Sequence, residues 1–190
     1  MRSLVRAGAL LAVCASAVVV FAGVAAGAGK VFKETIHDEF EFVDDDFCGA
    51  GLEVEVAVTL DIRVNVLARG PDQLVYFMQH FTETDVLTNL ENGRSLRSVV
   101  KAIDKDLRVT DNGDGTLTVL ILATGNATLY GENGKAIARN PGQIRVELLV
   151  DHGGTPNDPS DDVVLSEEMV KGSTGRSDDF CTAAVLALTG

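Results

Sequence analysis

The fold class of this chain is decided by residues 52–66, LEVEVAVTLDIRVNV. Every even position in this stretch is Leu, Val or Ile, and almost every odd position is charged or polar. Because successive side chains of a strand point to opposite faces, this alternation predicts a β-strand with one buried face and one solvated face. The stretch is longer than the usual strand of about 5–6 residues. Long strands suit a barrel or a strongly bent sandwich.

Further strands are predicted on both sides of this stretch. Alternating or β-branched segments lie at 32–42, 74–81, 116–123, 127–130, 144–150, 163–170 and 181–188. The segment 96–109 also fits helical spacing, but Asn92-Gly93 before it and a hairpin after it favour a strand. Turns are indicated at 111–115 (DNGDG) and 131–134 (GENG), because Asn-Gly and Asp-Gly supply the positive φ angles that tight hairpins need.

These segments together predict an all-β fold. The expected architecture is an antiparallel up-and-down β-barrel of about eight strands, with a two-sheet β-sandwich as the alternative. Residues 29–190 are expected to form a single β domain, because their number fits one domain and no Pro/Ser linker or break in composition divides them.

Residues 1–28 have the pattern of a secretory signal peptide. Arg2 and Arg6 precede an apolar run, residues 7–28, which ends in the small residues Ala26-Gly27-Ala28. A positive start, an apolar middle and an A-x-A end are the features of a cleaved signal. An uncleaved membrane anchor, for which the run is long enough, and a lipoprotein modified at Cys14 are the alternatives. We therefore expect a mature protein that is secreted and extracellular.

The tetrapeptide Asp-Asp-Phe-Cys occurs twice, ending at Cys48 and at Cys181. These are the only cysteines that follow the predicted leader. Cysteines of exported proteins are expected to pair, so we predict a Cys48–Cys181 disulfide that ties the first part of the fold to the last. In a barrel, this bond would help to lock the first strand to the last strand.

The chain is acidic, with a formal net charge of −12 from 16 Lys and Arg against 28 Asp and Glu. Nucleic acid is not an expected partner, because the basic surface that phosphates require is missing. No membrane partner is expected after signal cleavage, since anionic lipid surfaces also attract basic segments. The partners that we expect are a small apolar molecule or another protein.

An acidic loop, residues 151–162, is the candidate metal site. Its four aspartates are Asp151, Asp158, Asp161 and Asp162. Carboxylate oxygens are the ligands that Ca²⁺ prefers, and weak calcium sites occur in extracellular modules. The alternative is a solvated loop in which Pro and Gly set the turn geometry. No other cofactor is indicated, because the three histidines of the chain lack zinc-ligand spacing.

Aromatic and neighbouring side chains form the candidate ligand-binding surface. They belong to two of the expected strands, and they are Phe40, Phe42, Tyr76, Met78 and His80. A small barrel often holds one apolar ligand in an interior lined by such residues. The alternative is that they only fill the core. No catalytic residues are predicted, because the nucleophile motif G-x-S-x-G does not occur.

Motifs spread over nearly the whole mature chain carry a family resemblance. They are 46–51 (DFCGAG) before the long strand, 105–107 (KDL), 110–117 (TDNGDGTL), 151–156 (DHGGTP) and the closing 178–181 (DDFC). This arrangement resembles a group of uncharacterised secreted bacterial proteins, mostly from actinobacteria. The resemblance implies secretion and an all-β fold, and it implies no activity. Similarity to lipocalin-like barrels is architectural, and architecture does not carry function.

The sequence leaves three hypotheses for function. The leading hypothesis is a secreted, non-enzymatic β-barrel that binds a small apolar ligand or a partner. The second is a barrel enzyme of the cyclase or isomerase type that acts on an apolar substrate, with His37 or His80 as its ionisable group inside the barrel. The third is a calcium-stabilised structural or interaction protein of the cell envelope.

Overall fold

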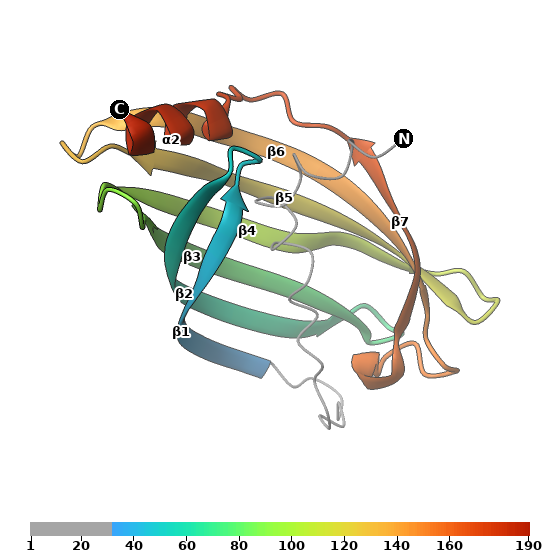
Figure 1. Ribbon diagram of the computed structural model, residues 1–190. Helices are drawn as coiled ribbons and strands as arrows, with labels where there is room; N and C mark the ends of the chain where they lie inside the picture. Colours follow the sequence, from blue (N-terminus) through green and yellow to red (C-terminus); the bar gives the residue numbers. More distant parts are fainter. Residues whose placement is uncertain (1–31) are drawn as a thin grey trace.

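The computed structural model describes residues 32–190, and the predicted leader lies outside this range. The described chain forms one sheet in which each strand pairs with the next in antiparallel register (Figure 1). The strands are β1 (Phe32–Phe47), β2 (Leu52–Arg69), β3 (Leu74–Asn89), β4 (Ser95–Asp111), β5 (Thr116–Tyr130), β6 (Ala136–Asp151) and β7 (Val163–Lys171). A 3-10 turn, η3 (Pro159–Asp161), precedes β7, and helix α2 (Phe180–Thr189) follows it.

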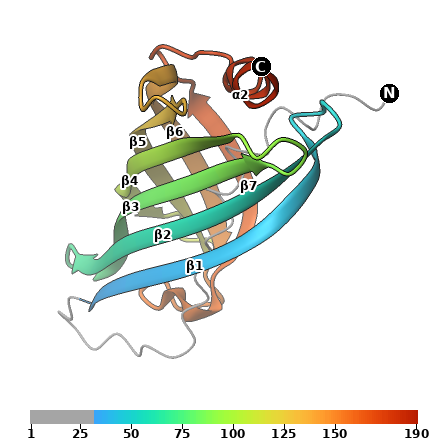
Figure 2. The same ribbon diagram turned by 60° about the vertical axis from the view of Figure 1, so that its left-hand side comes forward.

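The all-β, up-and-down arrangement confirms the coarse prediction, but the predicted closure into a barrel is wrong. Within residues 32–190, β1 pairs only with β2 and β7 only with β6, so the sheet is open and has seven strands. The strands also form a single sheet, which excludes the two-sheet sandwich. The sheet curls across its width, so that one of its faces is concave (Figure 2). The edge strands β1 and β7 stand at opposite ends of the strand order. Closure fails in part because the segment 181–188, expected as a strand, is helical.

Helix α2 forms because its first turn is capped and its interior is rich in alanine. The Asp179 carboxylate accepts hydrogen bonds from the Thr182 backbone N–H at 2.9 Å and from the Thr182 hydroxyl at 2.7 Å. Alanine has the highest helix propensity, and a capping side chain satisfies an otherwise unpaired backbone donor. The helix lies over one end of the sheet, where Ala184 and Leu188 are completely buried (Figure 1). No helix within residues 32–190 has the length and apolar character needed to cross a membrane.

The predicted Cys48–Cys181 disulfide is present. It joins the β1–β2 turn to the first turn of α2, and it therefore does not lock a first strand to a last strand as we expected. The other end of the helix is held at the β3–β4 turn, where the Asn89 and Asn92 amides donate to the Leu188 carbonyl at 3.2 and 2.9 Å. Both ends of α2 are thus fixed to hairpin turns of the sheet.

Three apolar clusters follow one another along the strands. The cluster beneath α2 contains the most deeply buried side chains, among them Val54, Leu87, Leu129 and Leu188. The central cluster contains Ile62, Val64 and Phe81. The cluster at the far end contains Val109, Leu117 and Val150. Helix α2 packs against the first cluster, so it covers one end of the concave face.

Candidate functional site on the concave face

Strand register decides which side chains share the concave face. Residues directly opposite each other in neighbouring strands point to the same side of a sheet. Val58 of β2 lies opposite Phe40 of β1 and Asp85 of β3, and Asp85 in turn lies opposite Ser98 of β4. These residues form one row across the sheet. The row belongs to the concave face, because Val58 is among the even-numbered β2 residues that are buried in the core.

The two faces of the sheet differ in charge: the convex face carries both cations and carboxylates, among them Glu55 and Asp61, whereas the charged strand residues of the concave face are acidic. By register, the charged strand residues of the concave face are carboxylates: Glu34, Asp38, Asp44, Glu83, Asp85, Asp104, Asp106, Asp111 and Glu167. Apart from Arg69 at the β2–β3 hairpin, the strand cations lie on the convex face: Lys33, Arg63, Arg97, Lys101, Lys105, Arg108, Arg139, Arg145 and Lys171. The concave side therefore concentrates uncompensated negative charge.

Asp85 is the most deeply buried of these carboxylates. The residue is 3% exposed, and its Oδ1 atom is buried with no hydrogen-bond partner. Burial raises the pKa of Asp85 to about 6, with a further contribution from the charge of Glu83, although a hydrogen bond with Ser98 acts in the opposite direction. A buried carboxylate with an unsatisfied oxygen destabilises a fold.

Two further carboxylates lie on the same face, farther from α2. Glu83 lies opposite Val100, and burial raises its pKa. Asp104 lies opposite Gln79 and accepts a hydrogen bond from the Gln79 amide at 2.9 Å; burial raises its pKa more than this hydrogen bond lowers it. Glu83 precedes Asp85 by two positions on β3, so the two side chains are neighbours on the same face.

Asp106 has a structural role and does not belong to the candidate site. The pairing of β4 with β5 shifts between Asp106 and Arg108. At this irregularity the Asp106 carboxylate accepts a hydrogen bond from the Phe77 backbone N–H at 2.7 Å. Burial raises the pKa of Asp106 to about 6, although the Phe77 hydrogen bond and the charge of Arg69 lower it. The side chain thus supplies an acceptor to a backbone donor where the ladder is irregular.

Phe40 and Phe42 provide the apolar part of the candidate site. Both lie on the concave face of edge strand β1, opposite Val58 and Val56. The two residues are 47% and 49% exposed, and their rings stack with centroids 6.4 Å apart. The rings therefore present apolar area that a ligand can remove from water.

On strands β4, β5 and β6, small residues occupy the middle of the concave face. Ala102, Gly125 and Gly142 lie opposite one another on β4, β5 and β6. A Cβ atom at Gly125 would lie 2.7 Å from the Ala102 Cβ and 2.7 Å from the Lys101 carbonyl oxygen, so no larger residue fits without movement of the backbone. This row brings little side-chain volume into the middle of the face.

The structure separates the predicted ligand-binding residues, which the sequence pattern grouped together. Met78 and His80 lie by register on the convex face. Tyr76 lies near the far end of the sheet, where its hydroxyl accepts a hydrogen bond from the Val109 backbone N–H at 3.3 Å. A single site on the concave face therefore includes the two β1 phenylalanines and excludes these three residues. Sequence could not decide the matter, because β3 has apolar side chains on both of its faces.

Neither histidine proposed for acid–base chemistry faces the concave side. His37 lies on the convex face, with Nδ1 2.9 Å from Asp61 Oδ1 and Nε2 3.4 Å from Glu39 Oε1. The hydrogen bond with Asp61 is the main reason that the pKa of His37 is raised. His80 is exposed on the same convex face. The enzymatic hypothesis therefore loses the two groups that it placed in the interior.

The acidic loop, our candidate calcium site, uses its carboxylates largely within its own turns. Three of its four predicted aspartates accept hydrogen bonds from inside the loop at 2.8–3.1 Å: Asp151, Asp158 and Asp161. Asp162 is half-buried, and burial together with the charge of Asp161 raises its pKa to about 6. Within residues 32–190, no three His, Cys, Asp or Glu side chains are arranged to hold a metal ion. Calcium binding here stays a prediction.

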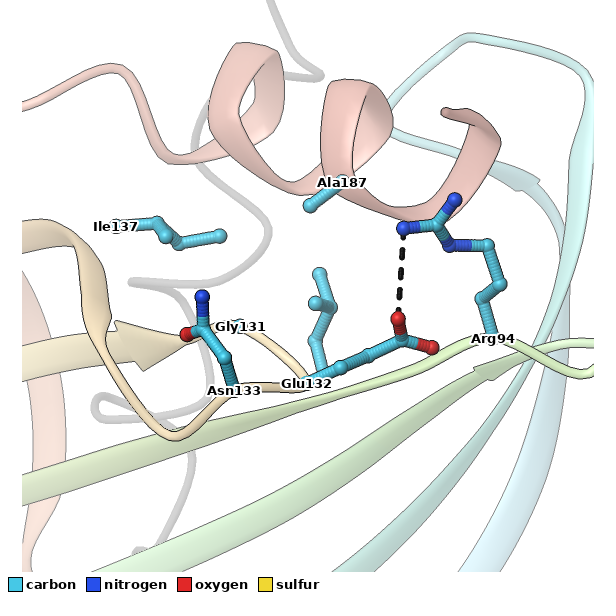
Figure 3. A pocket seen from close by; sticks show the side chains of 7 residues that line it. Arg94, Gly131, Glu132, Asn133, Ile137 and Ala187 are labelled. Atoms are coloured by element: carbon cyan, nitrogen blue, oxygen red, sulfur yellow. Dashed lines mark hydrogen bonds and ion pairs between the residues drawn. The ribbon is translucent and has the colours of Figure 1, made fainter.

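A small hollow lies between α2 and the β3–β4 and β5–β6 turns (Figure 3). Its volume is about 230 Å³, and it is lined by Arg94, Leu96, Gly131, Glu132, Asn133, Ile137 and Ala187. An ion pair lies beside it, with Arg94 Nη2 3.4 Å from Glu132 Oε2. Pockets for small molecules usually measure about 300–1,000 Å³. The hollow is therefore a weaker candidate than the concave face.

No protein-family model, curated protein or solved structure matches this chain. The function must therefore be inferred from the side chains that share the concave face. They are a buried carboxylate with a free oxygen, a second carboxylate beside it, and a pair of half-exposed phenyl rings. Chemically, such a surface can bury apolar area and hold positive charge.

Proposed function

We propose that this protein is a secreted, non-enzymatic binding protein that holds a small apolar molecule on the concave face of its sheet. The observation that supports this most strongly is the stacked pair Phe40 and Phe42, whose side chains are about half exposed on that face. Large apolar side chains are normally buried, and a contiguous exposed group of them marks an interaction surface. Complete burial of a phenyl ring against a ligand contributes about 1.5–3 kcal/mol.

The position of the two rings favours binding because the adjoining part of the sheet is rigidly held. Val56 and Val58, which lie opposite the rings, belong to the cluster beneath α2. That helix is fixed by the disulfide at one end and by hydrogen bonds to the Leu188 carbonyl at the other. A preorganised surface loses less conformational entropy when a ligand binds.

Titration of the purified protein with the neutral fluorescent probe N-phenyl-1-naphthylamine tests the proposal. We expect saturable binding, and we expect Phe42→Ala to weaken it about tenfold because part of the buried apolar area is lost. Val43→Ala is the matched control, since Val43 is 55% exposed and points to the convex side of the same strand. Absence of saturable binding, or an equal loss in the Val43 variant, would contradict the proposal.

One observation favours the enzymatic alternative, an isomerase or cyclase. A carboxyl group with a pKa of about 6, such as that of Asp85, can both donate and accept a proton near neutral pH. Chromatography and mass spectrometry of an apolar ligand after incubation with the protein separate the two functions. A binding protein returns the ligand unchanged, whereas an isomerase returns a product of the same mass and a different retention time.

A further inference from the structure

The free oxygen of Asp85 has no explanation within the fold. Asp85 is 3% exposed and lies beside the apolar cluster beneath α2, yet its Oδ1 atom has no partner. Nearly all buried polar atoms of native proteins form hydrogen bonds, and an exception calls for a reason such as a ligand. Asparagine or an apolar residue at this position would remove the cost of burying the charge. Because the carboxylate lowers stability and a neutral residue would not, stability alone does not explain an aspartate at this position.

No positive side chain of residues 32–190 faces Asp85 from the elements around it. The neighbouring strands contribute Val58 and Ser98 at the same level. The next row of the face contributes two more carboxylates, Glu83 on β3 and Asp38 on β1. The α2 residues that pack in the adjoining cluster are all uncharged. A positive charge that compensates ionised Asp85 would therefore come from outside residues 32–190.

We propose that the ligand is an organic cation with an apolar body, and that its positively charged nitrogen lies between the carboxylates of Asp85 and Glu83. This proposal rests on the binding function proposed above and names the class of ligand for the same site. An ammonium group would donate a hydrogen bond to the free Asp85 oxygen and compensate both negative charges. Hydrogen bonds between two charged groups are shorter and stronger than those between neutral groups.

The apolar body of such a ligand would extend from Asp85 toward β1. Phe40 and Asp85 occupy the same row with only β2 between them, so their backbones are two strand spacings, about 10 Å, apart. An alkyl or aromatic amine of that length can place its nitrogen at Asp85 and its body against the rings of Phe40 and Phe42. A calcium ion fits less well, because it takes about 6–8 oxygen ligands and most neighbours here are apolar.

Competition for the neutral probe among three ligands with a dodecyl chain tests the charge of the ligand. We expect dodecylamine to displace the probe at a concentration on the order of tenfold lower than dodecanol, because hydrogen bonds to charged groups are stronger. Dodecanoate should be the weakest competitor, since the carboxylates of the face repel it. The double variant Asp85→Asn, Glu83→Gln should lose the preference for dodecylamine over dodecanol.

Two controls keep the test interpretable. Asp61→Asn removes a carboxylate from the convex face and should leave the preference for dodecylamine unchanged. Asp85→Asn keeps the shape of the side chain and removes a buried charge, so it should melt at no lower a temperature than the wild type at neutral pH.

Each outcome separates the class of ligand from the binding function. If dodecanol binds and dodecylamine binds no more tightly, the cation proposal is overturned and the binding function stands. If neither the probe nor any dodecyl ligand binds, both are overturned. A preference for dodecylamine that survives in the double variant would overturn the assignment to Asp85 and Glu83.

Discussion

The side chains packed beneath α2 and the neighbouring side chains of the candidate site differ in how completely they are buried and hydrogen-bonded. Beneath the helix, Val54 and Leu87 are 0% and 1% exposed, and both ends of α2 are fixed to hairpin turns. Beside these residues, the side chains of Phe40 and Phe42 are about half exposed, and one oxygen of Asp85 is unpaired. The two groups share the same strands: Leu87 lies in the same row as Phe42, and Asp85 lies in the next row.

We infer from this difference that stability and the proposed ligand binding depend on different parts of one sheet. The disulfide and the apolar packing beneath α2 stabilise the fold. The neighbouring side chains can then include groups, such as a buried carboxylate, that lower stability when no ligand is bound. Proteins commonly accept such a loss of stability at functional sites. Substitutions at the two regions should therefore have opposite effects on the free energy of unfolding.

The largest effect should follow removal of the disulfide. Replacing Cys48 and Cys181 together by serine releases a link between residues 133 positions apart. The chain-entropy model gives a loss of about 4–5 kcal/mol for a loop of this order. Urea unfolding followed by circular dichroism measures the change. An unchanged unfolding midpoint would show that the end beneath α2 does not depend on this bond.

A smaller but clear loss should follow truncation of the helix core. Leu188 is completely buried, so Leu188→Ala should cost about 2–5 kcal/mol through lost burial and a residual cavity. Leu186 on the same helix is 67% exposed and gives the matched control. Leu186→Ala should change stability by no more than about 0.5 kcal/mol. Equal losses in the two variants would contradict the packing of α2 on the sheet.

Substitution at Asp85 should act in the opposite direction and depend on pH. On folding, the pKa of Asp85 rises from an ordinary 3.8 to about 6. At a pH between these two pKa values, Asp85 is therefore protonated in the folded state and ionised in the unfolded state. The contribution of Asp85 to the stability of the folded state relative to the unfolded state is therefore highest below about pH 4, and it is lost as the pH rises through about 6. Asp85→Asn should therefore be more stable than the wild type at pH 7, by on the order of 2 kcal/mol.

Urea unfolding of wild type and Asp85→Asn from acid to neutral pH measures this effect. Asp106 and Asp162, whose pKa values are also raised to about 6, are present in both proteins, so the difference between the two curves isolates Asp85. The difference should widen between about pH 4 and 6 and then stay constant. A constant difference across the whole range would mean that Asp85 does not titrate on folding.

The strands were predictable from sequence because their signals are local. The alternation in 52–66 appears as β2, and the turns at 111–115 and 131–134 separate β4 from β5 and β5 from β6. That the sheet stays open could not be predicted in this way, because whether the first and last strands pair depends on the whole fold and not on any local sequence pattern. The helix was missed because residues 181–188 are apolar on all sides. Asp179 as a cap and the alanines after it are the signals that could have revealed it.

The carboxylates of the candidate site were missed for a different reason. On β3 both sets of alternate positions mix polar and apolar residues, so the pattern of that strand does not say which set faces the core. Pairing with β2 places Glu83 and Asp85 opposite Leu60 and Val58, and only this register reveals them. Phe40 was recognised from the sequence because β1 keeps its aromatic residues on one side.

Intermolecular nuclear Overhauser effects between dodecylamine and the purified protein give the most direct test of a ligand site on the concave face. We expect contacts from the alkyl protons to the rings of Phe40 and Phe42, which lie on that face. Contacts to the Met78 methyl group or the His80 ring on the convex face, with none to the two phenylalanines, would contradict it.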